Sequence, residues 1–136
     1  MQTVQHDFRV MTYDIDFAGI VSNISYIRWL EDLRNLFAEQ ALSLGEAVQR
    51  GIAPALMHTE IDYLAPVRFP DRVTGRMWLA ESSRIRWVIA AEFQSQASGR
   101  LVARARQSGV FLALDSLRPV RLPQEYQTEK SSLEQD

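Results

Sequence analysis

The chain has 136 residues, a formal net charge of −2 and no cysteine. This length fits one ordinary domain, and a hydrophobic content of 46 % with 24 % charged residues is typical of a globular protein. No basic cluster suits nucleic acid, the absence of cysteine excludes disulfides and thiolate metal sites, and no apolar run has the length of a secretory signal or a membrane span. We therefore expect a cytoplasmic protein that binds neither nucleic acid nor membrane.

Alternating polar and apolar residues predict a first strand over residues 5–13. A helix is predicted from about residue 24 to 44. Its apolar residues recur at spacings of three and four: Ile27, Leu30, Leu33, Phe37, Ala41 and Leu44. Gly45 is expected to end this helix or to break it into a short second piece before Gly51.

After Gly51 the alternation returns and predicts four more strands, over residues 52–64, 72–82, 84–96 and 101–114. Residues 66–72 form a proline-containing turn, and residues 97–100 a hairpin turn. We expect consecutive hairpins with antiparallel pairing along this run, and a bulge at Gly109.

The order of strand, long helix and four strands predicts an α+β domain, in which an antiparallel five-stranded sheet wraps around one long central helix. The domain covers residues 1–125, and the polar residues 126–136 are expected to be disordered. The outer face and edge of such a sheet are left uncovered, with apolar residues such as Trp78 and Leu112 on them. We therefore expect a homo-oligomer, either a dimer or a tetramer.

Residues 13–23, YDIDFAGIVSN, join the first strand to the helix. Asp14 and Asp16 share a face if the segment is extended, and Gly19 allows a positive φ or a close backbone approach. Aspartates before a helix often form turns and complement the helix dipole, which is one interpretation. The other is a carboxylate directed at a substrate carbonyl.

The helix start strengthens the second interpretation. Ser22, Asn23 and Ser25 are natural N-cap residues. The first N–H groups of a helix have no intrahelical acceptor and carry partial positive charge, so they can hold a developing oxyanion. A carboxylate, amide donors and a close-fitting loop are suited to acyl transfer or hydrolysis.

The stretch YDIDFAGIVSNISYIRWLEDLRNLF resembles the acyl-CoA thioesterases of the hot-dog fold, in their 4-hydroxybenzoyl-CoA thioesterase-like group. The pattern of that group is Asp-x-Asp-x-x-Gly-(Val/Ile/His)-Val, four variable residues, then Tyr-x-Arg-(Trp/Phe). The matching positions are Asp14, Asp16, Gly19, Ile20, Val21, Tyr26, Arg28 and Trp29. The closing RPVRLPQEY and the order of elements are also similar, so the resemblance covers nearly the whole chain and implies a hot-dog fold.

The resemblance implies that Asp16 is the catalytic carboxylate, which attacks the thioester carbonyl or activates a water that does so. The polarising amide falls near Asn23, with Ser22 beside it. Gly19 lets the loop approach the acyl group, and Tyr26 is structural or lines the acyl pocket. The resemblance further implies a homotetramer of sheet-extended dimers, with active sites between subunits. Thioester hydrolysis needs no cofactor or metal.

Other polar residues have two interpretations each. Arg84, Arg86, Arg104 and Arg106 form either a positive strip for the phosphates of coenzyme A or a solvated face balanced by acidic residues. His58, Glu60 and Asp62 share one strand face. Because one histidine and two carboxylates are a weak metal signal, we expect a polar sheet face there. Glu31 could be a catalytic helix carboxylate, as in a second lineage of hot-dog thioesterases, but an ion pair with Arg28 or Arg34 is favoured.

The sequence therefore predicts hydrolysis of an aromatic or fatty acyl-CoA to free acid and CoA. One alternative is a hot-dog protein that binds acyl-CoA without turnover. A hot-dog hydratase is the other, although no histidine lies near the helix start. The variable residues 22–25, SNIS, lack the aromatic residue or histidine that many members of the group have, so the acyl group is left open.

Overall fold

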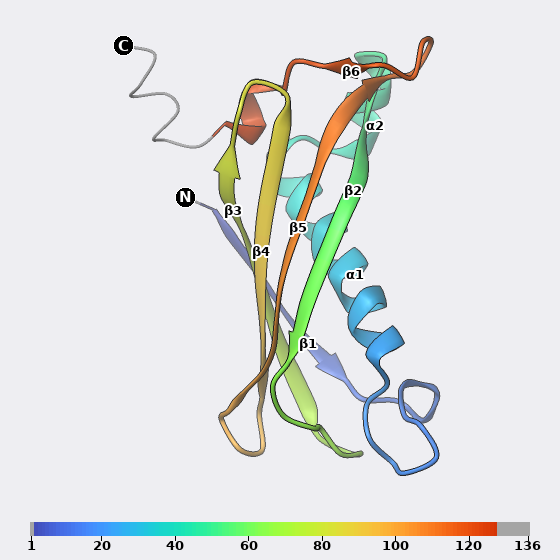
Figure 1. Ribbon diagram of the computed structural model, residues 1–136, viewed down its shortest axis with the longest axis vertical. Coiled ribbons are helices and arrows are strands. Elements are labelled where there is room, and N and C mark those ends of the chain that lie inside the picture. The colour runs from blue at the N-terminus through green and yellow to red at the C-terminus, as the bar shows by residue number, and fades with distance from the viewer. Residues whose placement is uncertain (1, 128–136) are drawn as a thin grey trace.

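The computed structural model describes residues 2–127. Its elements are β1 (Thr3–Arg9), α1 (Asn23–Ala41), α2 (Leu44–Gln49), β2 (Ile52–Tyr63), β3 (Arg72–Ser82), β4 (Arg86–Ser95), β5 (Leu101–Ala113) and β6 (Pro119–Val120). The strands form one antiparallel sheet, and α1 runs along its inner face (Figure 1). The predicted sheet around one long helix is confirmed, and the short β6 is added to the five strands expected.

The order of the strands in the sheet corrects one prediction. β3, β4 and β5 are joined as consecutive hairpins, but β2 pairs with β5 and not with β3, which gives the order β1-β3-β4-β5-β2. After β2 the chain crosses to the far side of the sheet, and Val67 there accepts a hydrogen bond from the Val21 N–H at 2.9 Å. Pro66 and Pro70 interrupt the ladder that a hairpin would need. β2 is therefore an edge strand of 12 residues.

α1 buries Leu30, Leu33 and Phe37 of the predicted apolar face, but Ile27 is 45 % exposed and Leu44 lies in α2. The Ser22 hydroxyl accepts the Ile24 N–H at 3.2 Å and caps the helix, whose buried face carries Trp29, Leu33 and Phe37. The helix ends at Ala41, and Gly45 lies inside α2 rather than at the break. The reason is local, since the Ser43 hydroxyl accepts the Glu46 N–H at 3.2 Å and begins a new helix.

The first strand is shorter than predicted. β1 ends at Arg9, and residues 12–14 form a 3-10 turn, in which the Asp14 carboxylate accepts the Met11 N–H at 2.9 Å. Tyr13, expected in the strand, is 71 % exposed. Because the Asp14 side chain bonds to the backbone of its own turn, the chain leaves the extended conformation and β1 ends early.

The bulge expected at Gly109 lies in the neighbouring strand. The register of β2 against β5 shifts between Leu56 and His58, so that Met57 is the extra residue, and Gly109 pairs with Leu56. Gly109 is needed for another reason. A Cβ at this position would overlap the Ala55 carbonyl oxygen and the indole ring of Trp87. Glycine there leaves room for the Trp87 ring and the Ala55 carbonyl group.

Gly109→Ala is expected to lower the free energy of unfolding by about 1–3 kcal/mol, because the added methyl group must displace Trp87 or the β2 backbone. Urea denaturation measures this change. Gly45→Ala is the matched control, since a Cβ at position 45 meets open space within a helix and should leave stability unchanged or slightly raised. Wild-type stability of the Gly109 variant would contradict the packing described.

The ordered fold continues past the expected end of the domain at residue 125. The boundary drawn after residue 125 falls inside a 3-10 turn, Gln124–Tyr126, whose Tyr126 is buried. Residues 128–136 of the expected tail lie outside the described part of the chain. Among residues 2–127, no helix is both long and apolar enough to cross a membrane.

Candidate active site

Asp16 lies in the loop between β1 and α1 and is exposed. Its Oδ1 accepts the N–H groups of Ala18 at 2.9 Å and Ile20 at 3.2 Å, and Gly19 has the positive φ of 75° that the sequence suggested. Within residues 2–127 no hydrogen bond reaches the Oδ2 of Asp16. One carboxylate oxygen therefore holds the turn, while the other is free to meet a substrate or a water.

Asp14 has a different role. It is 4 % exposed, and its Oδ1 accepts the Ser25 hydroxyl at 3.0 Å. Its backbone oxygen accepts the Ser22 N–H at 2.8 Å. Asp14 thus ties the loop to the first turn of α1. The two aspartates do not share a face as expected, because the 3-10 turn at residues 12–14 breaks the extended backbone.

The start of α1 offers an open donor. Asn23 is the first helical residue, and within the described residues its N–H has no acceptor, as expected at a helix start. Two apolar side chains of the loop and the first helical turn are exposed, Phe17 at 103 % and Ile24 at 64 %. The loop that holds Asp16 therefore leads into a helix start with an amide that has no acceptor among the described residues.

Tyr26 points into the core and is 3 % exposed. Its ring packs edge-to-face against Trp29 at 5.1 Å, Phe93 at 5.3 Å and Tyr63 at 5.6 Å between ring centres. Burial, with smaller effects from Tyr63 and Asp71, raises the pKa of Tyr26 to about 12. Tyr26 is therefore neutral, and its ring packs the first turn of α1 against the core.

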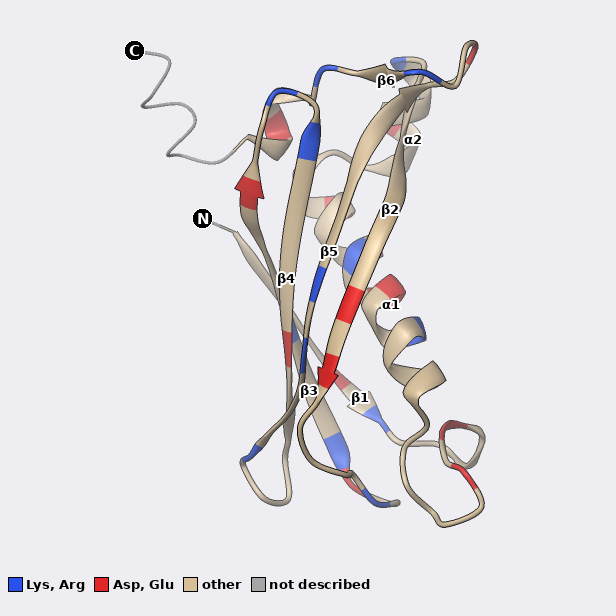
Figure 2. Cartoon of the chain, in the orientation of Figure 1, with Lys and Arg blue, Asp and Glu red and all other residues tan. Residues whose placement is uncertain are grey.

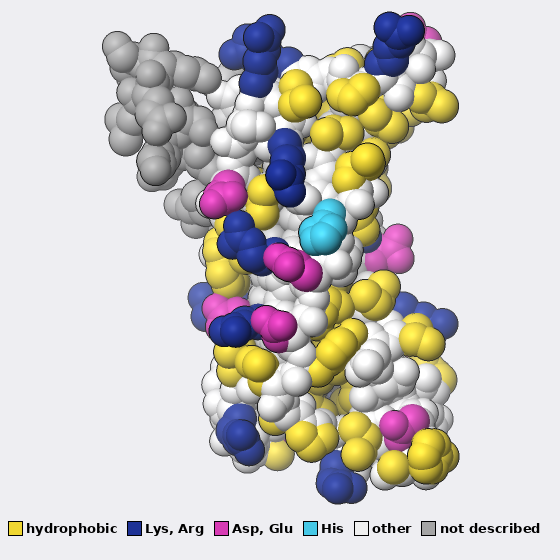
Figure 3. Space-filling model, in the orientation of Figure 1, with side chains coloured by type: hydrophobic (Ala, Val, Ile, Leu, Met, Phe, Trp, Pro, Cys, Tyr) yellow, Lys and Arg dark blue, Asp and Glu magenta, His cyan; other side chains and the backbone are white. Residues whose placement is uncertain are grey.

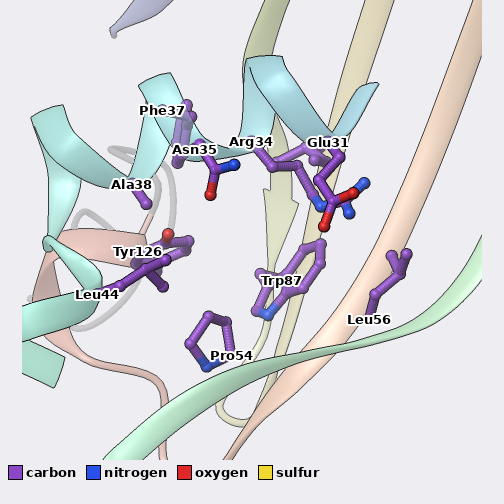
Figure 4. A pocket seen from close by; sticks show the side chains of 11 residues that line it. Glu31, Arg34, Asn35, Phe37, Ala38, Leu44, Pro54, Leu56, Trp87 and Tyr126 are labelled. Atoms are coloured by element: carbon purple, nitrogen blue, oxygen red, sulfur yellow. The ribbon is translucent and has the colours of Figure 1, made fainter. Parts of the chain in front are cut away.

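A cavity of about 220 Å³ lies between α1 and the inner face of the sheet. Figure 4 shows polar side chains from the helix on one side and apolar and aromatic side chains facing them. The lining residues are Glu31, Arg34, Asn35, Phe37, Ala38, Leu44, Pro54, Leu56, Trp87, Ile89 and Tyr126. This cavity was not predicted from the sequence. The spacing of residues 31, 34, 35 and 38, which places them on one helix face, was the available signal.

Arg34 is held on the cavity wall by a partly buried series of hydrogen bonds. Its Nη1 donates to the Oε1 of Gln107 at 2.7 Å, and the Nε2 of Gln107 donates to the Thr59 hydroxyl at 2.9 Å. Burial lowers the pKa of Arg34, and the nearby Glu31 partly opposes this shift. The predicted ion pair of Glu31 is not formed within residues 2–127, because Arg34 turns to Gln107 instead.

Three of the four arginines singled out from the sequence share the outer face of the sheet. Arg104 pairs with Asp62 at 3.1 Å and Arg106 with Glu81 at 3.4 Å, while Arg86 donates to the Ser108 hydroxyl at 2.9 Å. Arg84 lies in the turn before β4. Acidic and basic residues alternate across β5 and its neighbours (Figure 2). The outer face thus carries both positive and negative side chains.

The outer face also carries His58, Glu60 and Asp62, opposite Ser108, Arg106 and Arg104 of β5. Figure 3 shows histidine, acidic and basic side chains gathered over the middle of this face. No group of three or more His, Asp or Glu side chains among the described residues is arranged to hold a metal ion. This arrangement agrees with the polar sheet face that we expected.

Free N–H groups at a helix start can stabilise the negative charge that develops on a carbonyl oxygen. The chain matches the model of the thioesterase-like superfamily over residues 10–129. It is 29 % identical over 130 residues to a 1,4-dihydroxy-2-naphthoyl-CoA hydrolase from Synechocystis, covering 94 % of each chain.

Solved structures of other proteins are also similar to this chain. A 1,4-dihydroxy-2-naphthoyl-CoA thioesterase from Synechocystis is 27 % identical, with a TM-score of 0.82 and 98 % of both chains covered. A Staphylococcus aureus protein in complex with CoA shares the fold at 16 % identity, with a TM-score of 0.84 over 98 % of this chain and 83 % of that chain. The chain belongs to the thioesterase-like superfamily and is a thioester hydrolase with the predicted hot-dog fold.

Proposed function

We propose that the chain hydrolyses an aromatic acyl-CoA to the free acid and CoA at the junction of loop and helix. The observation that carries the proposal is the free Oδ2 of Asp16 in a loop that ends at the free N–H of Asn23. The hydrogen bond from the Ser22 N–H to the Asp14 oxygen, 2.8 Å long, closes this loop against the helix start.

In the proposed mechanism, the thioester carbonyl oxygen accepts the N–H of Asn23 and gains negative charge in the transition state. The carboxylate of Asp16 then follows one of two routes. It takes a proton from a water whose oxygen attacks the carbonyl carbon, or it attacks the carbon itself and the resulting anhydride is hydrolysed. In both, the carbon–sulfur bond breaks and CoA leaves as a thiolate that gains a proton.

An aromatic acyl group is favoured by the cavity and by the relatives. Trp87 and Tyr126 present ring surfaces to a cavity whose opposite wall is polar. The Synechocystis relative acts on a dihydroxynaphthoyl thioester, as its name states. A flat ring with polar substituents matches a cavity of this composition better than a long alkyl chain does.

We propose further that a second copy of the chain completes the site. Asn23 and Glu31 are separated by about 12 Å along the helix axis, so one aromatic acyl group does not span from the helix start into the cavity of the same chain. β2 is a long edge strand with an open side. Antiparallel pairing of two β2 strands places the Tyr63 end of one beside the Pro54 end of the other, so that the loop of each copy faces the cavity of its partner.

A thiol-release assay over aromatic, branched and long-chain acyl-CoAs tests the proposed function. The expected result is one free acid for each thiol, with the highest kcat/KM for aromatic acyl groups. Binding without thiol release would indicate an acyl-CoA-binding protein instead. Loss of the absorbance of an enoyl-CoA without thiol release would indicate a hydratase.

A further inference from the structure

Tyr126 closes one end of the cavity and is held firmly there. The residue is 5 % exposed, and its ring packs edge-to-face against Phe111 at 4.9 Å and Phe37 at 5.6 Å between ring centres. The preceding residue, Glu125, accepts two hydrogen bonds from Arg50, at 2.8 Å and 3.2 Å. The C-terminal segment therefore places this ring as a fixed wall of the cavity.

The hydroxyl group of Tyr126 has no hydrogen-bond partner in the part of the chain that the structure describes. No fully enclosed side-chain nitrogen or oxygen there lacks a partner, so this oxygen must still reach open space. Tyr126 is only 5 % exposed and lines the cavity, and Figure 4 shows its oxygen toward other lining residues, so the cavity is the space that this oxygen faces. Phenylalanine would fill the same place without this unmatched polar group.

Polar groups on the helix lie across from Tyr126. In Figure 4 the Asn35 side chain points from α1 into the cavity, and the Tyr126 oxygen lies on the side of its ring that faces Asn35 and Ala38. The side chains of Asn35 and Glu31 also have no hydrogen-bond partner among residues 2–127. Burial raises the pKa of Tyr126 to about 12, so its hydroxyl stays protonated and can donate.

We infer that Tyr126 determines substrate specificity: its hydroxyl hydrogen-bonds a hydroxyl or carbonyl oxygen on the acyl group, at the end remote from the thioester. The inference rests on the proposed function and deepens it, because it assigns the substrate class as aromatic acyl-CoA with a polar substituent on the ring. Tyr126 stays remote from the reacting atoms and acts by binding.

The test compares wild type and Tyr126→Phe on matched substrates, namely 4-hydroxybenzoyl-CoA with benzoyl-CoA, and 1,4-dihydroxy-2-naphthoyl-CoA with 2-naphthoyl-CoA. The variant keeps the ring and removes only the hydroxyl. We expect kcat/KM for at least one hydroxylated substrate to fall about 3- to 10-fold, mainly through KM, as for loss of one neutral hydrogen bond. The unsubstituted partner should change less than about twofold. Equal changes for both members of each pair would overturn the inference.

Calorimetric binding of the corresponding free acids gives a readout that does not need turnover. The Kd of the hydroxylated acid should rise by the same factor in Tyr126→Phe, while that of the unsubstituted acid stays constant. If wild type releases thiol but the variant discriminates as wild type does, only the Tyr126 assignment fails. If wild type releases no thiol from any acyl-CoA, the proposed function fails, and acid binding still decides the role of Tyr126.

Discussion

Asp16→Asn is expected to lower kcat for thioester hydrolysis by about 10²- to 10⁴-fold, the usual contribution of a positioned acid–base group. The amide oxygen of asparagine can still accept the N–H groups of Ala18 and Ile20, so the turn should survive. Asparagine carries no negative charge, and it can neither attack the carbonyl nor take a proton from water. Steady-state thiol release measures the loss, and circular dichroism checks the fold.

Asp32→Asn is the matched control for this prediction. Asp32 is an exposed residue of α1, outside the loop and outside the cavity lining. The same change of charge there should leave kcat within about twofold of wild type. A variant at position 16 that kept the wild-type rate on the best substrate would remove Asp16 from the mechanism.

Mixed oligomers are expected to recover activity that neither parent variant has. Asn35→Trp places a bulky ring in the cavity, and Asp16→Asn disables the loop, so each homo-oligomer should be nearly inactive. If each site joins the loop of one copy to the cavity of its partner, a hybrid dimer has one site with both parts intact. Random mixing makes half of the dimers hybrid, so about a quarter of all sites should work.

The experiment needs co-expression of the two variants, followed by thiol-release assays on the mixed protein. Asn35→Ala, which leaves the cavity open, serves as the control for the tryptophan and should be far more active alone. Recovery near a quarter of the wild-type rate supports a site shared between copies. An inactive mixture whose exchange of subunits has been demonstrated would place loop and cavity in the same chain.

Local chemistry explains why much of the fold was predictable. The three-and-four spacing of Leu30, Leu33 and Phe37 defines the buried side of α1, and the two-residue alternation defines the strands. The partner of β2 was not predictable in the same way, because pairing with β5 rather than β3 depends on the path of the chain after Tyr63. The bulge at Met57 likewise depends on the neighbouring strand, since Gly109 is the position that must stay free of a side chain.

The loop of the site could be predicted from the sequence, but the cavity could not. Turn and cap residues are local signals, so the positive φ of Gly19 and the cap at Ser22 followed from the sequence. The cavity brings together segments far apart in the chain, from Glu31 of α1 to Tyr126. Because the final segment has no periodicity, the burial of Tyr126 could not be read from it.

A crystal structure of Asp16→Asn bound to an aromatic acyl-CoA that the variant turns over slowly will show where the thioester binds. We expect the thioester carbonyl oxygen to accept a hydrogen bond from the Asn23 N–H, with the side chain of residue 16 facing the carbonyl carbon and the ring in the cavity lined by Trp87. A thioester bound elsewhere, with residue 16 facing bulk solvent and no cleft beside it, would contradict the proposed mechanism.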